Sequence, residues 1–78
     1  MQILYLYDIK AKNKREFNRV KRVFYYRLNK LGIVKLHFVT KSVLLVPHDL
    51  ERLLDAFFLG FKKSVEVYKA KCEKVEEL

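Results

Sequence analysis

The sequence predicts a small α+β fold in which two helices cover one face of an antiparallel sheet. Three observations predict it: short apolar runs typical of strands, two longer segments with apolar residues at helical spacing, and a chain of only 78 residues, which suits one domain. The composition is that of a packed globular chain, since 51% of the residues are hydrophobic and only two Gly and one Pro are present. We therefore treat residues 1–78 as a single domain.

The first third of the chain predicts a strand followed by a helix. Residues 2–8 contain a continuous apolar run, which is typical of a central strand buried on both faces. Asn13 fits an N-cap, and Glu16 three residues later completes a capping box. Apolar residues then recur at helical spacing, and Gly32 stands where a C-terminal cap belongs. The pattern predicts a helix over residues 14–31.

A hairpin is predicted next. Apolar and polar residues alternate over 34–38, which indicates a half-buried strand, and a second short apolar run covers 43–46. Residues 40–42 are polar and would form the turn, and Pro47 would end the second strand because proline cannot donate to a ladder.

A second amphipathic helix follows, with leucines and phenylalanines at helical spacing. It would start near His48 or Asp49 and end at Gly60 or Lys63. Residues 65–70 are then predicted as a strand, with a mobile or helical tail over 71–78. The alternative is a helix through this whole segment, because its apolar residues also fit helical spacing and its Glu and Lys have good helix propensity.

The resulting order, β-α-β-β-α-β, is the split βαβ arrangement of a ferredoxin-like plait. Its two helices would cover one sheet face, which leaves the other face to solvent or to a partner. Tyr5, Lys35 and His37 are the candidates for this open face.

Positive charge is concentrated in the predicted first helix. Between Ile9 and Leu31 there are nine Lys or Arg and one acid, a net of +8 that equals the formal charge of the whole chain. An ordinary solvated helix face has acidic residues interleaved with the basic ones, and this helix has only Glu16. The alternative is that the helix simply has a Lys-rich surface without a binding function. The exposed stripe suits contacts with a phosphate backbone, and a tyrosine within it would stack on a base or sugar. The predicted binding residues for DNA or RNA are Lys14, Arg15, Arg19, Arg22, Tyr26 and Lys30.

Asp8 ends the first strand and would lie beside the start of the basic helix. Its carboxylate is a ligand type that Mg²⁺ prefers, and such a metal would activate water or neutralise phosphate charge. No second acid follows it at a paired spacing, so a second copy of the chain would supply the missing ligand. Asp8 is thus the candidate catalytic and metal-binding residue, with Mg²⁺ between two subunits. The alternative is that Asp8 only starts a turn.

The remaining polar residues carry no catalytic pattern. His37 and His48 stand at no metal-ligand spacing, so each is at most a candidate general base. The lone Cys72 excludes an internal disulfide and favours a reducing cytoplasm. No apolar run approaches the roughly 18 residues that span a bilayer, and the start of the chain lacks the features of a signal peptide, so no membrane partner is expected.

Several segments also follow one another as in a known family. They are Tyr7-Asp8 at a strand end, the basic helix over 13–31, the hairpin, Leu50-Glu51-Arg52-Leu53, and Ser64-Val65-Glu66-Val67-Tyr68. In this order they resemble the small CRISPR-associated protein that partners the spacer integrase, over about residues 2–70. The hairpin departs from the family pattern, which usually reads Gln-x-Ser-Val-Phe-Glu where this chain has residues 37–42.

The resemblance implies a homodimer of ferredoxin-like subunits that bridges integrase dimers and holds new spacer DNA by its backbone, a function in antiviral defence. Some members are Mg²⁺-dependent endonucleases, with an Asp at the position of Asp8 as the metal ligand. Three alternatives stay open: a toxin-like metal-dependent endoribonuclease, a non-enzymatic nucleic-acid-binding regulator, and an interaction module whose basic face meets an acidic protein.

Overall fold

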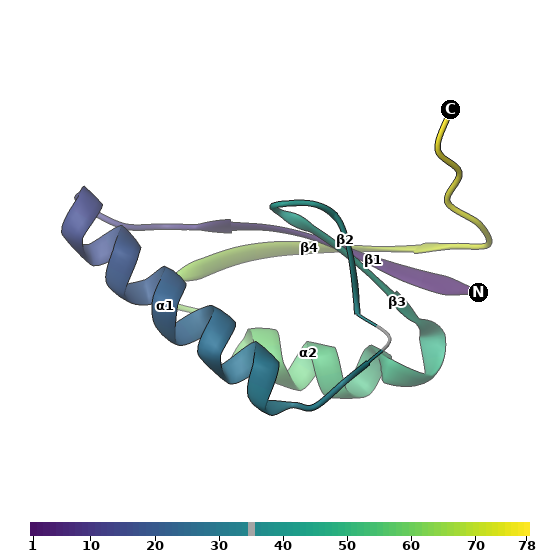
Figure 1. Cartoon of the computed structure of the whole chain (residues 1–78), viewed down its shortest axis with the longest axis horizontal. Helices are drawn as coiled ribbons and strands as arrows, with labels where there is room; N and C mark the ends of the chain where they lie inside the picture. The colour runs from purple at the N-terminus through teal and green to yellow at the C-terminus, as the bar shows by residue number, and fades with distance from the viewer. Residues whose placement is uncertain (35) are drawn as a thin grey trace.

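The computed structural model of the chain describes residues 1–34 and 36–78. In chain order the elements are β1 (Gln2–Ile9), α1 (Lys14–Lys30), β2 (His37–Thr40), β3 (Val43–Pro47), the short 3₁₀ turn η1 (His48–Leu50), α2 (Glu51–Leu59) and β4 (Val65–Cys72) (Figure 1). The predicted order of strands and helices is confirmed.

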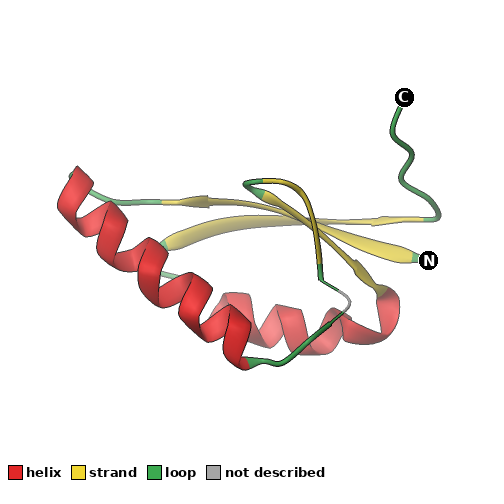
Figure 2. Cartoon of the chain, in the orientation of Figure 1, coloured by secondary structure: helices red, strands yellow, loops and turns green. Residues whose placement is uncertain are grey.

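The four strands form one antiparallel sheet in the order β2-β3-β1-β4. β3 lies between β1 and β2, and β1 lies between β3 and β4, so each βαβ unit is split by a strand of the other. Both helices lie on the same side of the sheet, and the C-terminal tail leaves on the opposite side (Figure 2). This is the ferredoxin-like arrangement, so the predicted fold class is confirmed.

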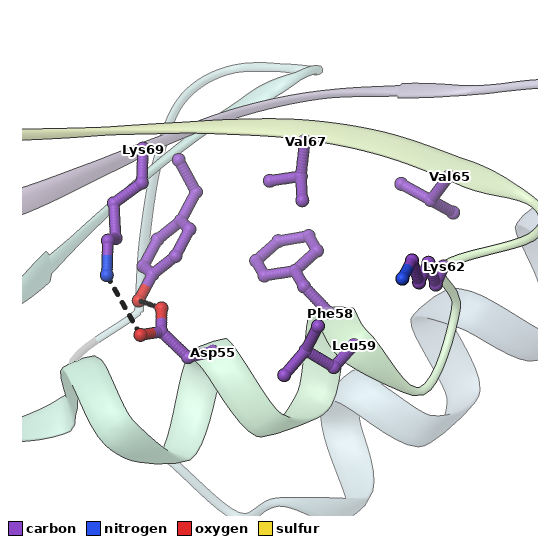
Figure 3. Close-up of a pocket in the computed structure, with 8 residues that line it drawn as sticks. Asp55, Phe58, Leu59, Lys62, Val65, Val67 and Lys69 are labelled. Atoms are coloured by element: carbon purple, nitrogen blue, oxygen red, sulfur yellow. Dashed lines mark hydrogen bonds and ion pairs between the residues drawn. The ribbon is translucent and has the colours of Figure 1, made fainter.

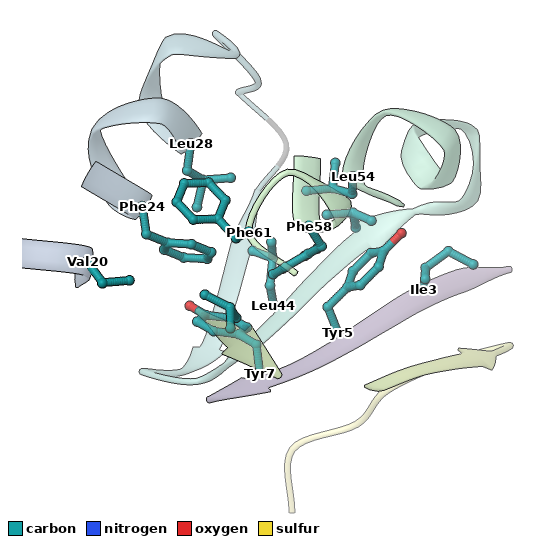
Figure 4. Packing of buried hydrophobic residues seen from close by; sticks show 12 residues of the cluster. Ile3, Tyr5, Tyr7, Val20, Phe24, Leu28, Leu44, Leu54, Phe58 and Phe61 are labelled. Atoms are coloured by element: carbon teal, nitrogen blue, oxygen red, sulfur yellow. The ribbon is translucent and has the colours of Figure 1, made fainter. Parts of the chain in front are cut away.

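The core fills the layer between the sheet and the two helices (Figure 4). Phe24 of α1 lies at its centre, fully buried, with its ring centroid 5.1 Å from that of Tyr7 and 5.3 Å from that of Phe61. Offset and edge-on ring pairs at such distances add to the free energy of area burial. The aromatic residues therefore hold α1 and the segment after α2 against the sheet.

Tyr5 belongs to this core, which corrects its predicted place on the open sheet face. Its side chain is 1% exposed, and its ring stacks on Phe58 at 5.0 Å. The prediction was wrong because every residue from 3 to 7 is apolar, so the sequence carries no alternation to mark the inward face. His37 is exposed as expected, and Lys35 lies outside the described residues.

α1 begins and ends where its capping residues predict. Asn13 Oδ1 accepts a hydrogen bond from the Glu16 N–H at 2.8 Å. The Glu16 carboxylate in turn accepts a hydrogen bond from the Lys12 N–H at 2.9 Å. In a standard capping box the donor would be the N–H of the N-cap residue itself, which is Asn13. Gly32 has a φ of +65°, a conformation that glycine adopts without steric cost and that is common just past a helix end.

Several boundaries differ from the prediction. α2 begins at Glu51, after the 3₁₀ turn η1, rather than near His48 or Asp49, and it ends at Leu59. β2 starts at His37 rather than near residue 34, and the register shifts between Phe38 and Thr40. β4 extends to Cys72, and residues 73–78 form neither helix nor strand, so the helical alternative for the end of the chain is wrong. The whole of β1 pairs with β4, and this long ladder outweighs the local helix propensity. Neither helix within residues 1–34 and 36–78 combines the length and apolar character needed to cross a membrane.

Candidate nucleic-acid interface

The exposed face of α1 gathers three of the predicted residues. Arg15, Arg19 and Arg22 line one shallow hollow of about 380 Å³, together with Asn13 and Glu16. They lie together because Val20, Phe24 and Leu28 bury the other side of the helix. Among the residues that the structure describes, none of the three arginines forms an ion pair. Their guanidinium groups are therefore available to phosphate oxygens, for which their planar donor geometry is suited.

The other predicted residues of α1 are also exposed but do not line this hollow. Lys30 comes 15 residues after Arg15 in the sequence, which separates them by about 22 Å along the helix axis. The Lys30 Nζ stands 5.3 Å from the centre of the Tyr26 ring, a cation–π distance. Lys14 is exposed in the first turn. The six predicted residues thus share one helix, with the arginine hollow at its N-terminal end and the Tyr26–Lys30 pair at the other.

Asp8 is exposed near the end of β1 and has a carboxylate neighbour that the sequence did not indicate. Its register partner on β4 is Glu66, so both side chains project from the open face of the sheet. They line a hollow of about 260 Å³ with Leu6, Val43 and Tyr68 among its walls. No sequence spacing could have found Glu66, because only the register of β4 places it there.

The fit of this pair to Mg²⁺ depends on what else surrounds it. The Lys10 Nζ lies 2.8 Å from Glu66 Oε2, and this contact raises the pKa of Lys10, so an ammonium group competes with a cation for Glu66. No three His, Cys, Asp or Glu gather as metal ligands in the described part of the chain. Mg²⁺ often takes only one or two protein carboxylates and completes its shell with water and substrate phosphates. One subunit therefore offers a partial ligand set, Asp8 and Glu66, that a phosphate or a second subunit would have to complete.

A groove also runs between α1 and the β2–β3 hairpin. It consists of two adjoining hollows, of about 150 and 430 Å³, that share Lys21, Tyr25 and Lys41. The smaller hollow extends to Asp8 and Phe17, and the larger one to Phe38 and Thr40. We call this the hairpin groove and define it by Phe17, Lys21, Tyr25, Phe38 and Lys41. Local sequence patterns do not reveal this groove, because its two walls are far apart in the chain.

Two tyrosine hydroxyls tie the hairpin turn to the helix layer. The hydroxyls of Tyr7 and Tyr25 are 3.0 Å apart, and each lies 3.1 Å from the carbonyl oxygen of Lys41. Burial, and then the hydrogen bond to Tyr25, raise the pKa of Tyr7, so its hydroxyl stays protonated and keeps a proton to donate. The wall of the hairpin groove is therefore held in place by three elements, β1, α1 and the turn.

A further pocket lies between α2 and β4 and contains none of the predicted residues. It has a volume of about 370 Å³, and apolar side chains such as Phe58, Val65 and Val67 form most of its wall (Figure 3). The Lys69 Nζ closes one end of it, 2.9 Å from Asp55 Oδ2. The charges at this end are paired with each other, since Lys69 contacts both Asp55 and Glu51.

A comparison of the chain with protein-family models, curated proteins and solved structures found no match.

Proposed function

We propose that this chain is a cytoplasmic nucleic-acid-binding subunit of CRISPR spacer acquisition, or a close relative of such subunits. It would hold the backbone of DNA or RNA on α1. The observation that carries this proposal is the hollow in which Arg15, Arg19 and Arg22 converge. Glu16 also lines this hollow, but none of the three arginines forms an ion pair with it or with any other described residue. Contacts of this kind position a nucleic acid without specifying its sequence. The resemblance adds a CRISPR integrase as the protein partner.

We further propose a homodimer formed through the open sheet face. This face carries Leu4, Leu6, Val43 and Tyr68, and of these Leu6 is 40% and Tyr68 66% exposed. Both helices lie on the other side of the sheet, so two open faces could meet while the basic α1 helices stay apart. Asp8 and Glu66 project from the same face, so a two-fold pairing would bring the carboxylates of two subunits toward one interface.

Salt-dependent binding tests the backbone contact. Arg15→Gln, Arg19→Gln and Arg22→Gln, singly and together, would be compared with the wild type on duplex DNA and on single-stranded DNA and RNA. Each lost phosphate contact should lower the slope of log K against log salt by about 0.7–0.9. The matched control is Arg52→Gln, an exposed arginine on α2, which should leave the slope unchanged. If the triple variant keeps the wild-type slope, the arginine hollow does not bind the backbone.

A metal-dependent endonuclease, including a toxin-like ribonuclease, is the second candidate function. The specific observation in its favour is the cross-strand pair of Asp8 and Glu66. Bound Mg²⁺ would supply an activated water and neutralise phosphate charge there. Lys10 would have to leave Glu66 for both carboxylates to face the cation, because its ammonium group now occupies that oxygen.

Cleavage assays separate the two functions. Labelled single-stranded RNA and duplex DNA would be incubated with the wild type, Asp8→Asn and the control Asp49→Asn, in Mg²⁺ and in EDTA. An endonuclease should cut only with metal, and Asp8→Asn should lose cutting while a gel shift shows unchanged binding. Binding without any cutting by the wild type would leave a scaffold or regulator, and cutting that survives in Asp8→Asn would remove Asp8 from the site.

A further inference from the structure

We propose that the hairpin groove binds a single-stranded segment of nucleic acid, with a base stacked on Phe38 and the neighbouring phosphates on Lys21 and Lys41. This inference rests on the proposed function and adds the form of nucleic acid that is recognised. It also places the contact on a second surface, between α1 and the hairpin, in addition to the arginine hollow.

Phe38 is an aromatic residue placed for stacking. Its register partner is Leu44, a core residue, so Phe38 projects toward the helix side of the sheet. It comes from the edge strand β2, however, and remains 41% exposed. Its ring lies 6.1 Å from that of Tyr25 at an interplanar angle of 54°. A base that stacks on an exposed aromatic ring gains free energy whatever its identity, because every base has a π face.

The groove is organised before any ligand arrives. The Tyr25 hydroxyl is held by the Tyr7 hydroxyl and the Lys41 carbonyl, and its ring meets Phe24 edge-on at 5.0 Å. The partner ring of Phe38 and the backbone of the turn are thus fixed by the core. A ligand would therefore order few protein groups on binding, which reduces the entropic cost of association.

The charges of the groove favour an anion. Lys21 from α1 and Lys41 from the turn are both exposed, and neither forms an ion pair with any residue that the structure describes. Asp8 is the one acid in the lining, and it belongs to the smaller hollow, away from Phe38. The larger hollow, of about 430 Å³, is within the range of roughly 300–1,000 Å³ typical of small-ligand sites.

A single strand fits these features better than a duplex. The bases of a duplex are already stacked and paired, so a duplex would offer phosphates to Lys21 and Lys41 but no free base face to Phe38. An unpaired strand offers both, in alternation along its length. The combination of aromatic and basic residues in one groove is the usual design of single-strand binding sites.

The test compares Phe38→Leu with the wild type, using a labelled oligothymidine and the same strand annealed to oligoadenosine. Leucine keeps an apolar contact with Tyr25 but removes the aromatic face. Affinity for the single strand should fall about 5- to 150-fold, which is the loss that one base–aromatic stack represents, and affinity for the duplex should not change. Leu53→Ala on α2 is the matched control, since Leu53 is 42% exposed, and it should change neither affinity.

A second variant reports stacking directly and does not depend on affinity. The chain contains no Trp, so Phe38→Trp introduces a single tryptophan whose emission oligothymidine should quench and the duplex should not. The groove inference is wrong, and the proposed function stands, if wild type binds nucleic acid with the expected salt dependence, Phe38→Leu binds oligothymidine as tightly as wild type, and oligothymidine leaves the emission of Phe38→Trp unchanged. If wild type binds no nucleic acid at all, the proposed function fails, and the groove inference fails with it.

Discussion

Asp55 joins α2 to two strands through a small polar network. Its Oδ1 accepts a hydrogen bond from the buried Tyr5 hydroxyl at 2.7 Å, and its Oδ2 lies 2.9 Å from the Lys69 Nζ (Figure 3). Lys69 also reaches Glu51 at 2.6 Å. Burial by itself would raise the pKa of Asp55, but the hydrogen bonds from Lys69 and Tyr5 outweigh it and keep this pKa below its ordinary value. The network satisfies Tyr5 and holds the β4 edge onto α2.

Acid should weaken the fold through Asp55. Because its pKa is lower in the folded chain than in the unfolded one, its stabilising contribution is present at neutral pH and is lost as the pH falls below about 4. Asp55→Asn should reduce the free energy of unfolding at pH 7 by about 1 kcal/mol and should flatten its dependence on pH. Urea unfolding at pH 7 and pH 3, followed by circular dichroism, measures both effects.

The control for this experiment is Asp49→Asn, an exposed carboxylate that forms no ion pair with the described residues. It should unfold like the wild type at both pH values. Equal pH dependence of Asp55→Asn and wild type would show that Asp55 contributes nothing to acid sensitivity.

At the scale of an element, one face of α1 packs in the core and the opposite face is exposed and positively charged. Val20, Phe24 and Leu28 are buried at helical spacing, while the arginines of the hollow stand outside. Its sequence therefore predicted both faces, because helical periodicity decides which residues share a side. One flank of α1 was less predictable, because Lys21 and Tyr25 line the hairpin groove only as a result of the hairpin turn lying beside them.

The contribution of the N-terminal cap of α1 to the stability of the fold should be measurable. Asn13→Ala removes the hydrogen bond to the Glu16 N–H and should cost about 1 kcal/mol, which lowers Tm by roughly 4–8 °C in a domain of this size. Asn13→Ser should recover most of the loss, since serine is an equally good cap. Thermal unfolding would be compared with Asn18→Ala, an exposed asparagine inside α1 whose removal should not destabilise the chain. A Tm of Asn13→Ala equal to that of wild type would argue against the cap.

At the scale of the whole molecule, the two faces of the sheet differ in what covers them. The two helices cover one face of the sheet and bury the aromatic core beneath them. The other face of the sheet carries Leu4, Leu6, Val43 and Tyr68. A chain of 78 residues buries only about 60% of its unfolded surface and gains from covering more of it. The second copy proposed above would cover this face and would leave both arginine hollows outside.

Leu6→Lys tests the dimer. It places a charge in the middle of the open face, where a partner would bury it without a counter-ion, so the variant should be monomeric while staying folded. Light scattering after gel filtration should give about twice 9.4 kDa for wild type and 9.4 kDa for Leu6→Lys. Leu59→Lys, at an exposed position on α2, should remain dimeric. A wild type that elutes as a monomer at high concentration would refute the dimer.

The sequence alone determined the order of elements as far as α2, the caps of α1 and the basic face with Arg15, Arg19 and Arg22, whereas it left the last element open between a strand and a helix. These features depend on residues only a few positions apart, so periodicity and capping preferences suffice to predict them. The strand ends were less secure, because β2 and the last residues of β4 are defined by their neighbours in the sheet.

Only the tertiary structure decided which face of β1 is buried and which distant residues meet. A continuous apolar strand is compatible with either face turned inward, and packing against the helices chose the one that buries Tyr5. The register of β4 placed Glu66 beside Asp8, and the position of the hairpin placed Phe38 beside Tyr25. Such contacts join segments that are far apart in the chain, and local sequence patterns carry no information about their alignment.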